Sequence, residues 1–133
     1  MNYRVERVVV GLQELVAGLN PIRRVDPIAL ANAYTDFDAQ HLGLRPLSDY
    51  YIADFGEGAE PYVERRRWYK ASAGLKTVKG LLQHYRDILI RGKDPLGREP
   101  GVIQKKVHIL EQLQSVLQDV ETAGVGFCLL VTD

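Results

Sequence analysis

The chain has 133 residues, with 17 basic and 17 acidic side chains and therefore a formal net charge of zero at neutral pH. This length suits one domain, so we expect residues 1–133 to form a single domain. The balanced charge argues against a nucleic-acid-binding protein, which usually carries excess basic residues on one face. The single cysteine, Cys128, excludes an intrachain disulfide and a thiolate zinc cluster.

The first expected element is a helix over residues 4–18. Its apolar side chains lie within roughly 60° of one line on a helical wheel; they are Val5, Val8, Val9, Leu12, Leu15, Val16 and Leu19. The three consecutive valines of residues 8–10 favour a strand instead, because they are β-branched. Strict alternation, however, would place Arg7 among apolar side chains, so the pattern predicts a helix that ends at Gly18.

A second helix is expected to begin at Asp26 and Pro27. An aspartate there caps the unpaired amides of the first turn, and a proline loses nothing at the first helical position. The apolar face of this helix is narrow and consists of Leu30, Ala33, Tyr34 and Phe37. Gly43 predicts its end, because glycine readily adopts the left-handed conformation of a helix cap.

The pattern changes between Leu44 and Lys70, where aromatic residues become frequent. Six of them gather within residues 50–69: Tyr50, Tyr51, Phe55, Tyr62, Trp68 and Tyr69. Short strands are expected at residues 50–55 and 62–69, with a loop between them that is rich in glycine and glutamate.

Two longer helices are expected within residues 72–122. Their apolar residues recur at spacings of three and four: Leu75, Val78, Leu82, Tyr85 and Leu89 in one helix, and Ile103, Val107, Leu110, Leu113, Leu117 and Val120 in the other. Ser72 is the expected N-cap of the first helix, and Pro100 lies in the first turn of the second. The short Gly/Pro loop between them predicts an antiparallel hairpin.

The run from Val125 to Val131 is apolar and follows Gly124, so it predicts a buried strand. Taken together, the elements predict an α+β fold. The expected architecture is a single domain dominated by four helices. It contains the antiparallel helical hairpin and a small sheet of one to three short strands, including the C-terminal run.

The densest group of candidate binding residues lies in the aromatic segment. Guanidinium groups bind phosphate or carboxylate, and tyrosine and tryptophan are frequent in contact surfaces. The candidates are Tyr50, Tyr51, Arg65, Arg66, Arg67, Trp68 and Tyr69. Two alternatives stay open: the nearby Glu57, Glu60 and Glu64 can neutralise the arginines, and the aromatic side chains can instead fill the core.

Metal ligands, cofactors and catalytic residues are not predicted. His84 with Asp87, and His108 with Glu111, resemble a metal site across two helices, but their helical positions point away from the shared apolar seam. No Gly-x-Ser-x-Gly or His-Glu-x-x-His motif occurs. Cys128 lies in an apolar run and is expected to be a buried, unreactive thiol.

No part of the sequence resembles a targeting or membrane segment. The first residues include Arg4, Glu6 and Arg7, unlike the apolar core of a signal peptide. No run approaches the roughly 18 apolar residues of a membrane span. We therefore expect a cytoplasmic protein that does not bind a membrane.

The leading functional hypothesis is a small, non-enzymatic protein–protein interaction or assembly module. Its partner is another protein or a second copy of the chain, as in a homodimer. The alternative is a protein that binds a small anionic ligand in a pocket lined by tyrosine and arginine, with or without catalysis.

Overall fold

The computed structural model describes residues 6–33, 35–53 and 68–132. In chain order its elements are β1 (Arg7–Leu12), α1 (Pro21–Arg24), α2 (Pro27–Ala31), α3 (Asp36–His41), the 3-10 helix η1 (Leu47–Tyr50), β2 (Tyr51–Ala53), β3 (Tyr69–Lys70), α4 (Ala71–Arg91), α5 (Pro100–Ala123) and β4 (Gly126–Thr132). Helices thus combine with a small sheet, as the α+β prediction requires. In the described ranges, two long α-helices and three short ones stand where four helices were expected.

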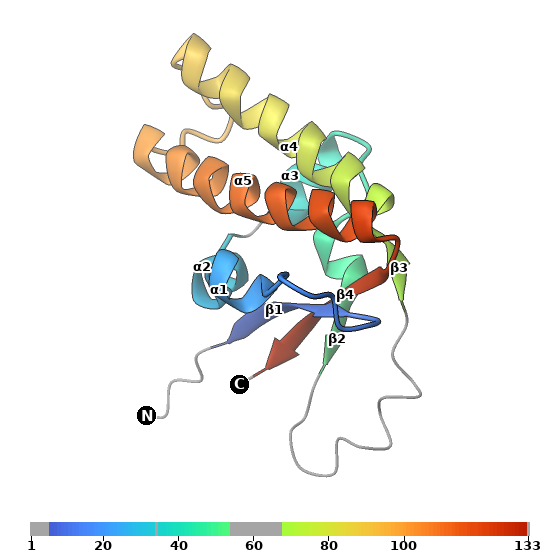
Figure 1. Cartoon of the computed structure of the whole chain (residues 1–133). Helices are drawn as coiled ribbons and strands as arrows, with labels where there is room; N and C mark the ends of the chain where they lie inside the picture. The colour runs from blue at the N-terminus through green and yellow to red at the C-terminus, as the bar shows by residue number, and fades with distance from the viewer. Residues whose placement is uncertain (1–5, 34, 54–67, 133) are drawn as a thin grey trace.

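The centre of the sheet is β4, which confirms the strand predicted for the C-terminal run (Figure 1). Along one edge, β1 pairs with it in antiparallel orientation, with Val10 opposite Leu129. Along the other edge, β2 is parallel to β4 and β3 is antiparallel, with Tyr69 opposite Phe127. The predicted strands at residues 50–55 and 62–69 are therefore present in part, and residues 54–67 lie outside the described residues.

The helix expected over residues 4–18 is wrong, because β1 occupies residues 7–12. Val8 and Val10 are buried on one face of the strand, whereas Arg7 is exposed and Val9 is half-buried on the other. The outer face of an edge strand tolerates a charge near the end of the strand. Arg7 therefore did not exclude a strand with alternating buried and exposed side chains. The run of β-branched valines was the stronger signal.

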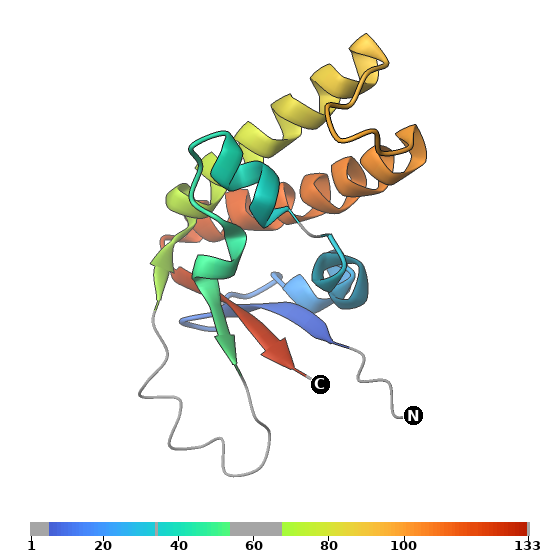
Figure 2. The ribbon, with the colours of Figure 1, turned by 180° about the vertical axis from the view of Figure 1, so that it is seen from behind.

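The second expected helix is divided into α2 and α3 (Figure 2). Its predicted start is confirmed, since the Asp26 carboxylate accepts hydrogen bonds from the backbone N–H groups of Ile28 and Ala29 at 3.0 and 3.2 Å. Its predicted end is also confirmed, because Gly43 follows α3 at a φ of +71°. The break between the helices turns Phe37 outward, so Phe37 is 63% exposed instead of lying on a buried face.

The predicted antiparallel hairpin is confirmed by α4 and α5, which lie side by side across one face of the sheet (Figures 1 and 2). Pro100 begins α5, and Gly92 and Gly124 end the two helices in left-handed conformations. Ser72 is not the N-cap, since α4 begins one residue earlier, at Ala71. The loop end of the hairpin projects beyond the sheet.

The core lies between the hairpin and the sheet. Phe127 and Leu129 of β4 are buried there with Leu75 and Leu117 of the hairpin. Cys128 is buried, as predicted. Across the part of the chain that the structure describes, no helix has both the length and the apolar character needed to cross a bilayer.

Candidate functional site

Two of the predicted binding residues, Tyr50 and Tyr69, meet at the edge of the core. Their rings are 5.0 Å apart and nearly perpendicular, and the Tyr50 ring also lies 5.2 Å from that of Phe127. The Arg45 guanidinium lies over both tyrosine rings, at 4.9 and 5.3 Å from their centroids, which is cation–π geometry. Tyr50 is fully buried, and burial raises the pKa of its hydroxyl. The sequence analysis did not single out Arg45.

The other predicted residues are not gathered with this pair. Half-buried Trp68 lines a hollow of about 470 Å³ beside the start of α4, together with Lys70 and Ser72. Tyr51 lines a different hollow, together with residues of α2 and α3. Arg65, Arg66 and Arg67 lie outside the described residues. A pocket lined by both tyrosine and arginine therefore stays a prediction.

The hollow that contains Tyr51 is lined by both apolar and acidic residues. It has a volume of about 240 Å³, and its lining includes Leu30, Leu47 and the exposed Phe37. Glu6 and Asp36 also line it. Burial, together with the negative charges of Asp36 and Glu6, raises the pKa of Tyr51 to about 12. We call this feature, defined by Glu6, Asp36, Phe37 and Tyr51, the acidic hollow.

The loop end of the hairpin carries exposed apolar and basic side chains, in contrast to the acidic hollow. Ile90 is 82% exposed at the end of α4, and Leu96 is exposed in the loop that follows. Arg91 and Lys93 are exposed beside them. We call these four residues the hairpin tip; Figure 1 shows that this end of the hairpin stands away from the sheet.

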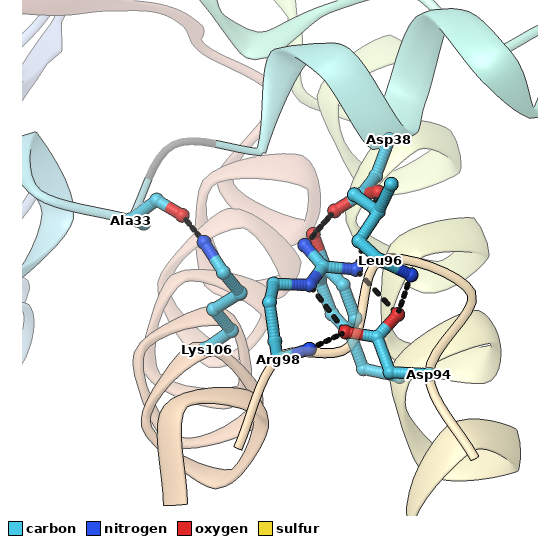
Figure 3. A network of polar contacts seen from close by, with 7 residues as sticks. Ala33, Asp38, Asp94, Leu96, Arg98 and Lys106 are labelled. Atoms are coloured by element: carbon cyan, nitrogen blue, oxygen red, sulfur yellow. Dashed lines mark hydrogen bonds and ion pairs between the residues drawn. The ribbon is translucent and has the colours of Figure 1, made fainter. Parts of the chain in front are cut away.

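A buried polar network joins α3, α4 and the hairpin loop (Figure 3). The Tyr85 hydroxyl donates to Asp38 Oδ2 at 2.6 Å, and Arg98 Nη1 donates to the same oxygen at 2.6 Å. Arg98 Nε donates to Asp94 Oδ2, also at 2.6 Å. One guanidinium thus bridges two carboxylates that come from different parts of the chain.

The charges in this network stabilise one another. Burial alone would raise the pKa of Asp38, but the hydrogen bonds from Arg98 and Tyr85 and the charge of Arg98 outweigh it and lower the pKa. The hydrogen bond from Arg98 lowers the pKa of Asp94 to about 2. Both carboxylates are therefore ionised at neutral pH.

Lys106 lies close to this network (Figure 3) and lines a cavity. It is only 8% exposed, and its Nζ donates to the backbone carbonyl of Ala33, just after α2. Burial, reinforced by the positive charge of Arg98, lowers the pKa of Lys106, and the Asp38 carboxylate opposes this shift. The cavity has a volume of about 730 Å³ and lies between α2 and α5.

Sequence reasoning missed Lys106, although a signal was present. Ile103, Lys106 and Leu110 follow the three–four spacing of buried positions in α5. The apolar Val107 was assigned to that stripe instead, and it is only half-buried. A lysine at a buried position of an apolar stripe is an exception to the usual burial pattern and marks a place to look for a site.

Among the described residues, the histidines are not grouped with acidic side chains in a way that could hold a metal ion. His108 is exposed and lies 3.2 Å from the side-chain nitrogen of Gln112. Within residues 6–33, 35–53 and 68–132, no group of three or more histidine, cysteine, aspartate or glutamate residues is placed to hold a metal ion.

Comparison with known proteins assigns no family. No protein-family model, curated protein or solved structure matches the chain. The acidic hollow, the hairpin tip and the Lys106 cavity are therefore the features on which a function can be argued.

Proposed function

We propose that this protein is a small, non-enzymatic assembly module that binds a second copy of itself from head to tail. The acidic hollow of one copy receives the hairpin tip of the next. The observation that carries the proposal is a pair of exposed apolar side chains beside opposite charges. Phe37 is 63% exposed and shares the hollow with two carboxylates, whereas Ile90 of the hairpin is 82% exposed and lies next to Arg91 and Lys93.

The apolar parts of the two features supply the attraction. Burying a large apolar side chain contributes on the order of 1.5–3 kcal/mol relative to leaving it in water. Phe37 and Ile90 each present such a side chain to solvent. Seating Ile90 against Phe37 and Leu47 would remove both exposed groups from water at one contact.

The charges favour one orientation of the two copies. Glu6 and Asp36 border the hollow, whereas Arg91 and Lys93 accompany Ile90. Opposite charges across a contact speed association and suppress wrong arrangements. The zero net charge of the chain adds no overall repulsion between copies.

The two features are different surfaces, so the contact is heterologous. Such a contact closes into a ring or continues as an open chain, unlike a two-fold dimer. The projection of the hairpin tip beyond the sheet leaves it accessible to a neighbouring copy (Figure 2). The assembly is therefore expected to grow with protein concentration.

Sedimentation velocity over a range of concentrations tests this proposal. Phe37→Glu disables the hollow and Ile90→Glu disables the tip, so each variant alone should remain monomeric. A mixture of the two variants has one intact hollow and one intact tip, and should form a dimer and nothing larger. Ile22→Glu, at a 59%-exposed position on α1, is the matched control and should assemble like the wild type.

Two results would overturn the proposal. One is a wild-type protein that stays monomeric at every concentration. The other is assembly that Phe37→Glu and Ile90→Glu leave unchanged.

Added salt should weaken the assembly, because it screens charges at an exposed contact.

A further inference from the structure

The cavity between α2 and α5 has the dimensions of a small-molecule site. Its volume of about 730 Å³ falls within the usual range for such sites. The walls are largely apolar, with Ala29 and Ala33 on one side and Val102 and Ile109 on the other. The buried Lys106 and its carbonyl partner Ala33 both line the cavity.

The surroundings of Lys106 make its ammonium form less stable than that of an exposed lysine. Burial removes water from the ammonium form, and the nearby Arg98 guanidinium adds repulsion. Asp38 acts in the opposite direction, but two donors already occupy its carboxylate. Among the described residues that line the cavity, the other charged or titratable groups are Asp26 beside α2 and Lys105 and His108 on α5. A desolvated lysine beside another cation is an effective nucleophile toward carbonyl carbon.

We propose that this cavity binds a small apolar aldehyde or ketone and that Lys106 captures its carbonyl carbon as a Schiff base. The Nζ lone pair forms the new C–N bond, and the carbonyl oxygen takes up a proton to give a carbinolamine. A second proton, taken from solvent, then converts the hydroxyl into water, the C–O bond breaks and water leaves, and the remaining amine proton returns to solvent as the C=N bond forms. Binding at this site is independent of head-to-tail assembly.

The hydrogen bond from Lys106 to Ala33 can also be explained by a purely structural role. The chain breaks its helix after α2, and the Lys106 Nζ satisfies the carbonyl that the break leaves exposed (Figure 3). A purely structural lysine would be protected from reagents. The proposed site requires the opposite, because a carbonyl compound in the cavity must reach Nζ.

Reductive trapping with butanal and sodium cyanoborohydride at pH 6.5 tests the proposal on the full chain. Peptide mass spectrometry then measures butylation at each lysine. Lys106 should be modified about tenfold or more faster than the exposed Lys105, because only a neutral amine attacks a carbonyl. In concentrated urea the preference should disappear, since the cavity and the buried environment are lost.

Two variants separate cavity binding from general reactivity. Ala29→Leu narrows the cavity while leaving Lys106 in place, so it should slow the modification of Lys106 and leave that of Lys105 unchanged. Lys105→Met is the matched control and should keep fast labelling at Lys106. Circular dichroism checks that both variants are folded.

Equal or slower labelling of Lys106 relative to Lys105 in the folded protein would overturn the proposal. Fast labelling that Ala29→Leu does not change, in a folded variant, would also overturn it, because the carbonyl compound would then not occupy the cavity.

Discussion

At the scale of single residues, Tyr85 carries a buried hydrogen bond that tests the polar network. Its hydroxyl donates to Asp38 at 2.6 Å, and burial together with this bond raises the pKa of Tyr85. Tyr85→Phe should lower the free energy of unfolding by about 1–3 kcal/mol, since Asp38 loses a donor that water cannot replace. Tyr51→Phe removes the hydroxyl of a tyrosine that is 37% exposed, so it is the control and should change the free energy of unfolding by less than about 0.5 kcal/mol. Urea denaturation at pH 7 measures both, and equal effects would contradict the interpretation.

Arg98 should make the stability of the protein depend on pH in acid. The pKa values of Asp38 and Asp94 are lower in the folded state than their ordinary values, so the unfolded state binds more protons as the pH falls below about 5. The free energy of unfolding should therefore decrease from pH 5 toward pH 2. In Arg98→Gln the decrease should be shallower, because the hydrogen bonds and the charge by which Arg98 lowers the pKa values of Asp38 and Asp94 are then lost.

Urea denaturation at pH 5, 4 and 3 measures this slope. Arg91→Gln removes an exposed arginine from the same loop region and is the matched control, which should retain the wild-type slope. Identical slopes in the wild type and in Arg98→Gln would show that the Asp38 and Asp94 carboxylates do not depend on Arg98.

At the scale of elements, two glycines in the hairpin should respond in opposite ways to alanine. A Cβ atom at Gly74 of α4 would lie 2.7 Å from Phe127 Cζ, and the Phe127 ring is fully buried. The overpacking should cost about 1–3 kcal/mol and outweigh the gain in helix propensity. At Gly101 of α5 a Cβ would meet nothing within 4 Å, so Gly101→Ala should stabilise the protein by about 0.4–1 kcal/mol. Thermal denaturation of the two variants checks both signs.

The elements that sequence predicts well are those whose signals are local. Pro100 and Gly124 bound α5, and the apolar stripes lie within a few turns of one another. For strand β1 the local signals conflict, because the consecutive valines favour a strand whereas the apolar spacing also fits a helix. Val10 is buried because Leu129 of β4 lies opposite it, and that partner is more than a hundred residues away in the chain. The local pattern was therefore compatible with either a helix or a strand.

The candidate sites follow the same distinction. The aromatic segment was visible in the sequence, and Tyr50 and Tyr69 do meet. Arg98 and Asp38 are 60 residues apart, so no spacing could reveal their ion pair. Lys106 was detectable as a charge at a buried helical position, but its cavity depends on how α2 packs against α5.

At the scale of the whole molecule, β4 links segments that are distant in the sequence. It pairs with β1 from the first part of the described chain and with β2 and β3 on its other edge, while the hairpin covers one face (Figure 1). Non-local pairing of this kind slows folding, because long loops must close before contacts form. It also predicts that the sheet and the hairpin unfold together as one cooperative unit.

Leu129 of β4 provides the test of this cooperativity. Leu129 is almost fully buried, whereas the adjacent Leu130 is half-buried and points to the other face of the strand. Leu129→Ala should lower the free energy of unfolding by about 2–5 kcal/mol, and the matched control Leu130→Ala should cost less than half as much. In the Leu129→Ala variant, helical circular dichroism and the fluorescence of Trp68, the single tryptophan, should shift to the same lower denaturation midpoint. Separate midpoints would mean that the hairpin survives loss of the sheet, and residues 1–133 would then not behave as the single domain that their length predicts.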